Sequence, residues 1–493
     1  MKQKNKNIIT QSHTSKNPAI HFPSKFLDTL LHYVSQYDII ILFILLYLAY
    51  NTVDSVTLMS GDTTPASLIP VALLNNHNIY LDFASAYIFS QNFSYAFPFV
   101  QNHYVSLFPI VTPVLVTPVY AISAFLSIIL GSPVFGGNSV IFLSKSAASA
   151  IAALAGVFVY LSGKELFSKR IATLTTFIFA FATSTWSISS QALWQHGTVE
   201  LFLAALFYLM IKNEKTESWR YIFLMGILSG LFVFNRPPDS LLIIPVIFYI
   251  LWIQRARIHY YLIGGILGGL PFFWYNYSIF GNIFGGYAQN LSLFAVNAGF
   301  IGNYLGLLIA PNVGLFIFCP ILLLSIAGFY GIYINKDSHI RTLLLVAGIA
   351  VILEVLLYSF FTQWSSSAAY CFGPRFLTGL IPILCIYTGF FLNKWFGTGK
   401  VTHFGQKKWI AITIIGALII SSVCIQIIGV FFYKFSSKSN MSMNDERAWD
   451  VSDSLIVRSA IEGTPKVSGI MIFILPPLPP VIEYDFVMRS GVG

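Results

Sequence analysis

Several ionisable residues suited to group transfer lie in loops that carry almost no other charge. Asp62 follows an apolar run, and an acid there can take a proton from a hydroxyl or hold a divalent cation against a phosphate. Arg236 and Arg375 carry guanidinium groups suited to bidentate contact with phosphate oxygens. His103 and His196 can donate to a phosphate or relay a proton. Together these residue types predict chemistry on a phosphate-bearing substrate.

The two candidate acids Asp62 and Asp82 also have ordinary structural roles open to them. Asp62 stands in SGDTTPASLIPVALL. An Asp, Ser or Thr that precedes Pro65 and an apolar run is a good N-cap, so Asp62 can simply start a helix. Asp82 stands in IYLDF, where a turn acid is as reasonable as a second-shell residue of a site. Spacing alone leaves both interpretations open for each acid.

Arg236 lies in the turn FNRPPDS between two short apolar runs. Each run spans about 21 Å as a helix, against a hydrocarbon core of about 30 Å, so we expect the turn to lie in a recess. A cation in such a place costs on the order of 3 kcal/mol or more unless it has a partner. That partner is either Asp239, three residues later, or a substrate phosphate.

Arg375 lies in FTQWSSSAAYCFGPRFLTGLIP, which offers serine hydroxyls and the stacking face of Trp364. We expect Arg375 at the top of a helix, as a phosphate ligand or as a snorkelling interfacial cation. His196, with Glu200 four residues later, is a second-shell candidate, although an interfacial His beside aromatic residues is the alternative there and at His103. Lys145 lies inside an apolar run and is a candidate to neutralise a lipid phosphate.

The composition requires a membrane to position these residues. Hydrophobic residues make up 56% of the 493, whereas charged residues make up only 10%, far below the quarter typical of soluble domains. Repeated long apolar runs predict an all-α polytopic membrane protein. The net charge of +9 fits inner loops facing anionic lipid headgroups, so we expect no nucleic-acid partner. Four cysteines suggest no disulfide framework, and GGILGGL (264–270) predicts a helix-packing face rather than a phosphate loop.

The chain divides into three parts by composition. Residues 1–38 form a basic cytoplasmic lead, residues 39–433 the multi-spanning domain, and residues 434–493 an outer tail. The spanning domain includes a first outer loop over 60–137. We expect about 11 transmembrane helices and one Pro-broken juxtamembrane or re-entrant element over 109–130, because three prolines fall within ten residues there.

The distribution of Lys and Arg predicts which loops lie inside. If 109–130 does not cross, nearly all Lys and Arg of the short loops fall on one side, leaving Arg236 and Arg375 on the other. Positive loops stay in the cytoplasm. We therefore expect a multi-pass protein of the plasma membrane, with the N-terminus inside, the C-terminus outside and the candidate residues on the outer face. A crossing 109–130 would instead place the loop 164–170 outside.

Several stretches resemble the GT-C superfamily of membrane glycosyltransferases, which use polyprenyl-phosphate sugars and include the protein mannosyltransferases. The resemblance covers about 39–430 and is carried by segments distributed along the chain: SGDTTPASLIPVALL, HYVSLFPIVTPVLVTPVY, STWSISSQALWQHGT, FNRPPDSLLIIP, APNVGLFIFCPILLLS and YCFGPRFLTGLIPIL. Two features depart from similar chains. Gly61 and Asp62 stand where many relatives have two adjacent acids, and a basic residue often found near Val313 is absent.

The resemblance implies transfer of a hexose or pentose from a polyprenyl-phosphate donor to a hydroxyl of a lipid, glycan or protein acceptor at the outer face. It implies Asp62 as the general base of an inverting single displacement. The donor phosphate would meet Arg375, Arg236, Lys145 and His103, with Asp82, His196, Glu200, Asp239 and Trp364 around them. No cofactor is certain, and the single acid puts the use of Mg²⁺ or Mn²⁺ in question.

Two other classes of function fit the composition. A lipid or glycan transporter, or flippase, would need no glycosyl transfer, although we find no persuasive internal repeat of the kind transporters often carry. A non-catalytic membrane scaffold would need none of the candidate residues. Loss of sugar transfer on removal of the Asp62 carboxylate would separate the first hypothesis from both.

Overall fold

The computed structural model describes most of the chain and divides it into two compact units. The described residues are 37–53, 60–85, 94–129, 135, 137–334, 339–366, 371–396, 406–433 and 444–463. The first unit, Met1–Leu42, is described only over its last residues, which begin helix α2 (Asp38–Tyr50). The second unit, Phe43–Gly493, holds every element discussed below. The predicted lead over 1–38 lies almost wholly outside the described residues.

The first outer loop of the prediction folds into short elements. Helix α3 (Thr63–Val71) begins directly after Asp62, and a two-stranded hairpin follows, formed by β1 (Phe99–Val100) and β2 (His103–Tyr104). Helix α5 (Val111–Ile129) packs against α3.

The prediction that prolines break the 109–130 segment is wrong. Helix α5 is one continuous helix of 19 residues. Pro109 precedes it, and Pro113 lies in its first turn, where the missing N–H has no intrahelical partner to lose. Only Pro118 lies inside the helix. By length and composition α5 is also a candidate span, so the assignment of sides rests on the Lys and Arg distribution alone.

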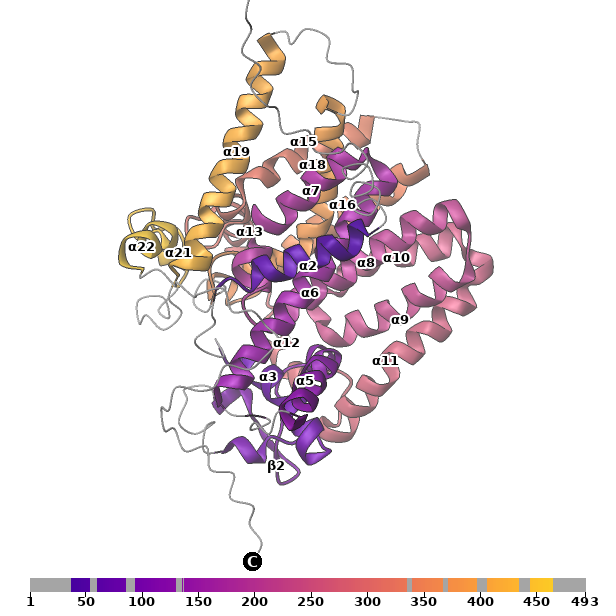
Figure 1. The fold of residues 1–493 in the computed structure, drawn as a ribbon, viewed down its shortest axis with the longest axis vertical. Coiled ribbons are helices and arrows are strands. Elements are labelled where there is room, and N and C mark those ends of the chain that lie inside the picture. The colour runs from indigo at the N-terminus through magenta and orange to yellow at the C-terminus, as the bar shows by residue number, and fades with distance from the viewer. Residues whose placement is uncertain are drawn as a thin grey trace, which may run out of the picture. The chain divides into compact units, whose positions relative to one another are not determined.

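Three consecutive helices pack together within the bundle. Helix α6 (Gly137–Leu166) packs against both α7 (Lys169–Phe181) and α8 (Gln195–Thr216), as Figure 1 shows. Most of the spanning part of α6 is buried, because its small side chains, as in SAASAIAALAG, let the neighbouring helices approach closely. The Ser168 side chain caps the start of α7 by accepting from the backbone N–H of Ile171.

Helices α9 (Trp219–Asn235) and α11 (Ile258–Phe280) form a tightly packed pair. A methyl group added at Gly226 would lie 2.2 Å from the Tyr261 carbonyl oxygen, and one at Gly268 would lie 2.3 Å from the Ile227 carbonyl oxygen. Such backbone contact is possible only with glycine at both positions. The prediction that GGILGGL is a packing face is therefore confirmed.

The second half of the chain supplies the remaining helices. The short helices here are α10 (Ile244–Phe248), α12 (Ala288–Leu291), α13 (Phe300–Ile309) and α14 (Leu315–Phe318). The longer helices are α15 (Leu323–Ile334), α16 (His339–Ser359), α18 (Ile381–Phe396) and α19 (Gln406–Phe431). Two short helices, α21 (Asp445–Ala448) and α22 (Leu455–Glu462), follow within the predicted tail.

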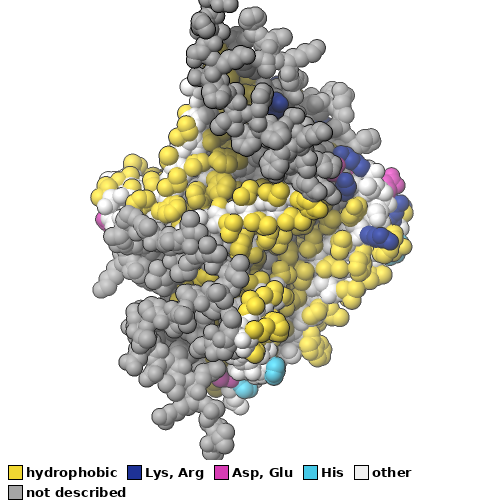
Figure 2. Space-filling model, in the orientation of Figure 1, with side chains coloured by type: hydrophobic (Ala, Val, Ile, Leu, Met, Phe, Trp, Pro, Cys, Tyr) yellow, Lys and Arg dark blue, Asp and Glu magenta, His cyan; other side chains and the backbone are white. Residues whose placement is uncertain are grey.

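The described helices confirm an all-α polytopic membrane protein. Five helices are long and apolar enough to cross a membrane: Val111–Ile129, Ser139–Leu166, Ile340–Ser359, Arg375–Phe396 and Trp409–Phe431. A sixth span arises if Pro237–Ile253 and Arg255–Phe280, bent by 102°, count as one. The predicted number of about 11 stays a prediction. Exposed apolar side chains cover much of the surface, as expected for helices that face lipid (Figure 2).

Candidate active site

Asp62 and Arg375 form an ion pair between distant parts of the chain. Arg375 Nη1 lies 3.3 Å from Asp62 Oδ2. Asp62 is 24% exposed at its side chain, whereas Arg375 is only 6% exposed. The base candidate is therefore accessible, while the cation beside it is almost fully enclosed.

The structure does not show the helix-cap role considered for Asp62. It occupies the residue before α3, but its side chain makes no capping hydrogen bond to the helix. The start of α3 is stabilised instead by Ser60, whose carbonyl accepts from the Thr64 hydroxyl at 2.7 Å, and by Thr63, whose hydroxyl accepts from the Ser60 N–H. The Asp62 carboxylate is therefore not needed as a cap and is directed to Arg375.

A glycine turn and two aromatic rings position Arg375. Gly373 has φ +103°, a left-handed conformation, and a methyl group there would meet the Phe318 ring at 2.5 Å. The following 3-10 turn, Arg375–Leu380, starts at the arginine itself. The guanidinium carbon lies 4.6 Å from the Trp194 ring centroid and 5.2 Å from that of Phe376. Such stacking holds the guanidinium plane in place.

His196 borders the same two rings. Its ring centroid lies 6.3 Å from that of Trp194 and 6.2 Å from that of Phe376. The side chain is 2% exposed, and neither ring nitrogen has a hydrogen-bond partner among the described residues. The expected interfacial surroundings of aromatic residues are present, but the unsatisfied nitrogens distinguish His196 from an ordinary core histidine.

Arg236 and Asp239 form a second, fully buried pair. Arg236 Nε donates to Asp239 Oδ1 at 2.8 Å, and Nη2 donates to the Tyr358 hydroxyl at 2.6 Å. That hydroxyl in turn donates to Asp239 Oδ1 at 2.5 Å. Arg236 is 4% exposed, as the short flanking runs predicted. Asp239 is the partner that such a buried cation requires.

Two aromatic residues that the sequence analysis did not select connect the pairs. The Tyr358 ring stacks on Phe376 with centroids 5.3 Å apart and planes 8° from parallel. Phe376 carries Arg375 on its ring, while the Tyr358 hydroxyl binds Arg236. Both arginines therefore contact one stack of rings. Tyr287 is buried within electrostatic range of both arginines and of Asp62 and Asp239.

Lys145 is bound to two backbone carbonyls. Its Nζ donates to the carbonyl oxygens of Tyr50 at 2.8 Å and Ser190 at 2.6 Å, and the side chain is 4% exposed. Tyr50 is the last residue of α2, and Ser190 follows the π-helical turn Thr185–Ser189. Lys145 therefore ties the end of α2 to the segment that precedes α8.

His103 and Asp82 form a pair of their own at the hairpin. His103 Nδ1 lies 2.7 Å from Asp82 Oδ2, and Asp82 Oδ1 accepts from the Tyr104 N–H at 2.7 Å. The Tyr80 ring stacks on His103 with centroids 3.8 Å apart. The pair is partly exposed, and its contacts run to the hairpin rather than to Arg375.

The remaining candidates, Glu200 and Trp364, are buried. Glu200 Oε1 accepts from the Ser189 hydroxyl at 2.7 Å. Trp364 packs so closely on α13 that a methyl group at Gly306 would lie 2.4 Å from its ring. Both side chains therefore support the walls of the bundle.

The described residues around Asp62 offer no complete set of protein ligands for a divalent cation, and metal use stays a prediction. Among them, no group of three or more His, Cys, Asp or Glu side chains is arranged to hold a metal ion. The Arg375 guanidinium lies 3.3 Å from Asp62 and would repel a cation there. No step of the chemistry below passes through a metal.

Comparison with known families gives one match. The model of the dolichyl-phosphate-mannose-protein mannosyltransferase family matches residues 118–268. This match confirms the resemblance to GT-C glycosyltransferases. It runs from α5 to α11 and includes Lys145, His196 and Arg236, while Asp62 and Arg375 lie outside it. It supports glycosyl transfer as the class of activity.

Other comparisons add little detail. No curated protein sequence matches the chain. The apo crystal structure of the Archaeoglobus fulgidus oligosaccharyltransferase is similar at 13% sequence identity and a TM-score of 0.49. The similarity covers 78% of this chain and 56% of the archaeal protein.

Proposed function

We propose that the chain transfers a sugar from a polyprenyl-phosphate donor to an acceptor hydroxyl at the outer face of the plasma membrane, with inversion. The observation that carries the proposal is the pair formed by Asp62 and Arg375. An acid that is not used as a helix cap stands beside an enclosed cation, in a chain whose family match is to glycosyltransferases. The acceptor is a lipid, a glycan or a protein.

Asp62 acts as the general base in this proposal. Its carboxylate takes the proton of the acceptor hydroxyl while that oxygen bonds to the anomeric carbon of the sugar. The bond from the anomeric carbon to the phosphate oxygen breaks in the same step, and the lipid phosphate leaves with the electron pair. Attack from the face opposite the leaving group inverts the anomeric configuration.

Arg375 receives the charge that develops on the leaving phosphate. In the free chain its guanidinium is paired with Asp62. A donor phosphate offers more negative charge and two oxygens for bidentate contact, so it competes with Asp62 for the guanidinium. Donor binding then frees the carboxylate to accept a proton, which links base activation to the presence of the donor. The rings of Trp194 and Phe376 keep the guanidinium in place throughout.

The other phosphate candidates have more distant roles. Arg236 supports the site through Tyr358 and Phe376, because its own charge is balanced by Asp239. His196 is placed to donate to a phosphate that reaches the two rings it borders. Lys145 ties the end of α2 to the segment that precedes α8, and the partly exposed His103–Asp82 pair lies at the outer-loop hairpin.

The test is transfer by the purified protein in nanodiscs, with polyprenyl-phosphate hexoses and pentoses carrying a labelled sugar. Membranes from a host that lacks the gene supply the acceptor. We expect labelled product with the anomeric configuration opposite to that of the donor. Product with retained configuration would exclude single displacement. Movement of intact donor across the bilayer without transfer would favour a transporter.

A further inference from the structure

The segment 444–463, within the predicted tail, is fixed to the membrane domain by one buried side chain. Asn312 is fully buried, and its amide nitrogen donates to the carbonyls of Arg447 at 2.7 Å and Asp450 at 3.2 Å. Its Oδ1 accepts from the Leu455 N–H at 2.5 Å. A single asparagine therefore satisfies three backbone groups of the segment, which fixes one side of it.

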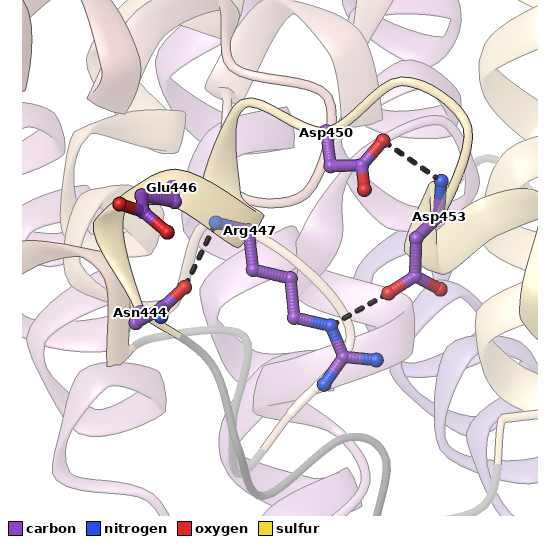
Figure 3. A pocket seen from close by; sticks show the side chains of 5 residues that line it. All are labelled: Asn444, Glu446, Arg447, Asp450 and Asp453. Atoms are coloured by element: carbon purple, nitrogen blue, oxygen red, sulfur yellow. Dashed lines mark hydrogen bonds and ion pairs between the residues drawn. The ribbon is translucent and has the colours of Figure 1, made fainter.

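Polar contacts continue along this side. Asp453 pairs with Arg447 Nε at 2.6 Å and also with Arg458, while Ser365 donates to Asp445 at 2.8 Å. Figure 3 shows the recess that results, which has a volume of about 350 Å³. It is lined by polar and charged side chains: Asn444, Glu446, Arg447, Asp450 and Asp453.

The segment lies at the level where a span ends. A methyl group added at Gly463, directly after α22, would lie 2.4 Å from the Phe432 carbonyl oxygen. Phe432 follows the last residue of α19, whose candidate span Trp409–Phe431 is only 28% buried. A mostly lipid-facing span that ends here places α22 at the depth of the membrane interface, whichever side of the membrane it lies on.

The opposite side of the segment is apolar and exposed. Val457 and Ile461 lie four residues apart on α22, so they share one face of the helix, and Ile461 is 76% exposed. Leu455 and Arg458 are buried on the other face. Trp449 and Val451, which precede α22, are also exposed apolar side chains, with Val451 73% exposed. Figure 2 shows hydrophobic side chains over this region and along α19.

We infer that the segment 444–463 rests in the lipid interface, with Trp449, Val451, Val457 and Ile461 facing the bilayer. An amphipathic helix with one apolar ridge lies in the interface plane, and Trp favours that depth. The acids of the segment outnumber its basic residues, so the attraction is to the apolar layer and not to anionic headgroups. Uncharged lipid suffices as the partner. The inference does not depend on the proposed glycosyl transfer.

The experiment places a polarity-sensitive fluorophore on single cysteines of the full chain in phosphatidylcholine nanodiscs. The exposed Cys424 is first replaced by Ser, and the described remaining cysteines are buried. Labels are introduced by Val457→Cys and Ile461→Cys on the apolar ridge, and by Glu446→Cys in the polar recess as the matched control. Quenching is measured with nitroxides near the top of the acyl chain and with a water-soluble quencher.

The ridge labels are expected to emit at shorter wavelength than the control, with severalfold stronger quenching by the lipid nitroxide than by the aqueous quencher. Adding phosphatidylglycerol is expected to change neither result. Equal access of the aqueous quencher to ridge and control labels would overturn the inference and would leave the ridge as a surface for another protein. The double variant Val457→Asp and Ile461→Asp is then made in a chain that carries its label at Val451→Cys. If its thermal unfolding is unchanged, we expect the lipid nitroxide no longer to quench this label. Retained quenching there would contradict a role for the ridge.

Discussion

The guanidinium of Arg375 lies 3.3 Å from the carboxylate of Asp62, although 313 positions separate the two residues. One residue precedes α3 and the other starts the 3-10 turn that leads into α18. The opposite charges meet in a largely enclosed place, with the acid more accessible than the cation, and this is where the proposed donor phosphate would bind. The first three predictions follow from this pair and its surroundings.

Arg375→Lys is expected to weaken donor binding. Lysine keeps the charge but loses the planar fork and the stacking on Trp194 and Phe376. We expect the KM for the polyprenyl-phosphate sugar to rise by roughly tenfold or more, the effect of losing one charge-assisted hydrogen bond. Steady-state kinetics in nanodiscs measure this, with the exposed Arg220→Lys as control. An unchanged KM would remove Arg375 from the donor site.

Tyr358→Phe is expected to destabilise the chain while keeping the ring stack on Phe376. The hydroxyl accepts from Arg236 and donates to Asp239, so its loss leaves two buried polar groups without one partner each. The free energy of unfolding should fall by about 1–3 kcal/mol. Thermal unfolding in detergent measures it, with Tyr330→Phe, an exposed tyrosine on α15, as the matched control. Equal unfolding of variant and wild type would show that the network contributes nothing.

Lys145→Met is expected to act on structure more than on donor binding. The substitution keeps the volume but takes the donor from the carbonyls of Tyr50 and Ser190. We expect a loss of about 1–3 kcal/mol in stability, with a KM for the donor close to wild type. Lys164→Met, at an exposed position of the same helix, is the control. A raised KM for the donor with unchanged stability would show instead that Lys145 contacts the donor phosphate.

Acid is expected to loosen the segment 444–463. Burial raises the pKa of Asp453, but hydrogen bonds from Arg447 and Arg458 outweigh it and hold that pKa below the usual value. A lowered folded-state pKa stabilises the segment above the unfolded value of about 3.9, and this stabilisation is lost as the pH falls through the folded value. A fluorophore at Ile461→Cys should report release only in that acidic range. Asp453→Asn should loosen the segment at neutral pH as well. If the variant behaves like the wild type, the ion pairs of Asp453 with Arg447 and Arg458 do not hold the segment in place.

Much of the architecture could be predicted from composition and the spacing of apolar runs. The glycines of 264–270 predicted a packing face because only backbone contact requires them, and the short runs around Arg236 predicted its burial. Asp239 was one of the two partners expected for it, beside a substrate phosphate, because a buried cation must have one. These inferences depend on local sequence and on the thickness of the membrane.

The rest depends on contacts between distant segments, which a single sequence does not encode locally. Tyr358 and Tyr287 stand in apolar or glycine-rich stretches and read as ordinary membrane tyrosines until folding brings them to the arginines. Lys145 was expected at a phosphate, because nothing in its own helix reveals the carbonyls of Tyr50 and Ser190. The continuity of α5 was missed because Pro109 precedes the helix and Pro113 lies in its first turn, so that only Pro118 stands where a proline disturbs a helix.

The central claim is tested most directly by Asp62→Asn. The amide keeps the size of the side chain and removes the base, so sugar transfer should fall by about a hundredfold or more, the contribution of one general base. Insertion into the membrane and thermal unfolding should match the wild type, as should all properties of the control Glu446→Gln. A normally inserted Asp62→Asn protein that transfers sugar at the full rate would contradict the account.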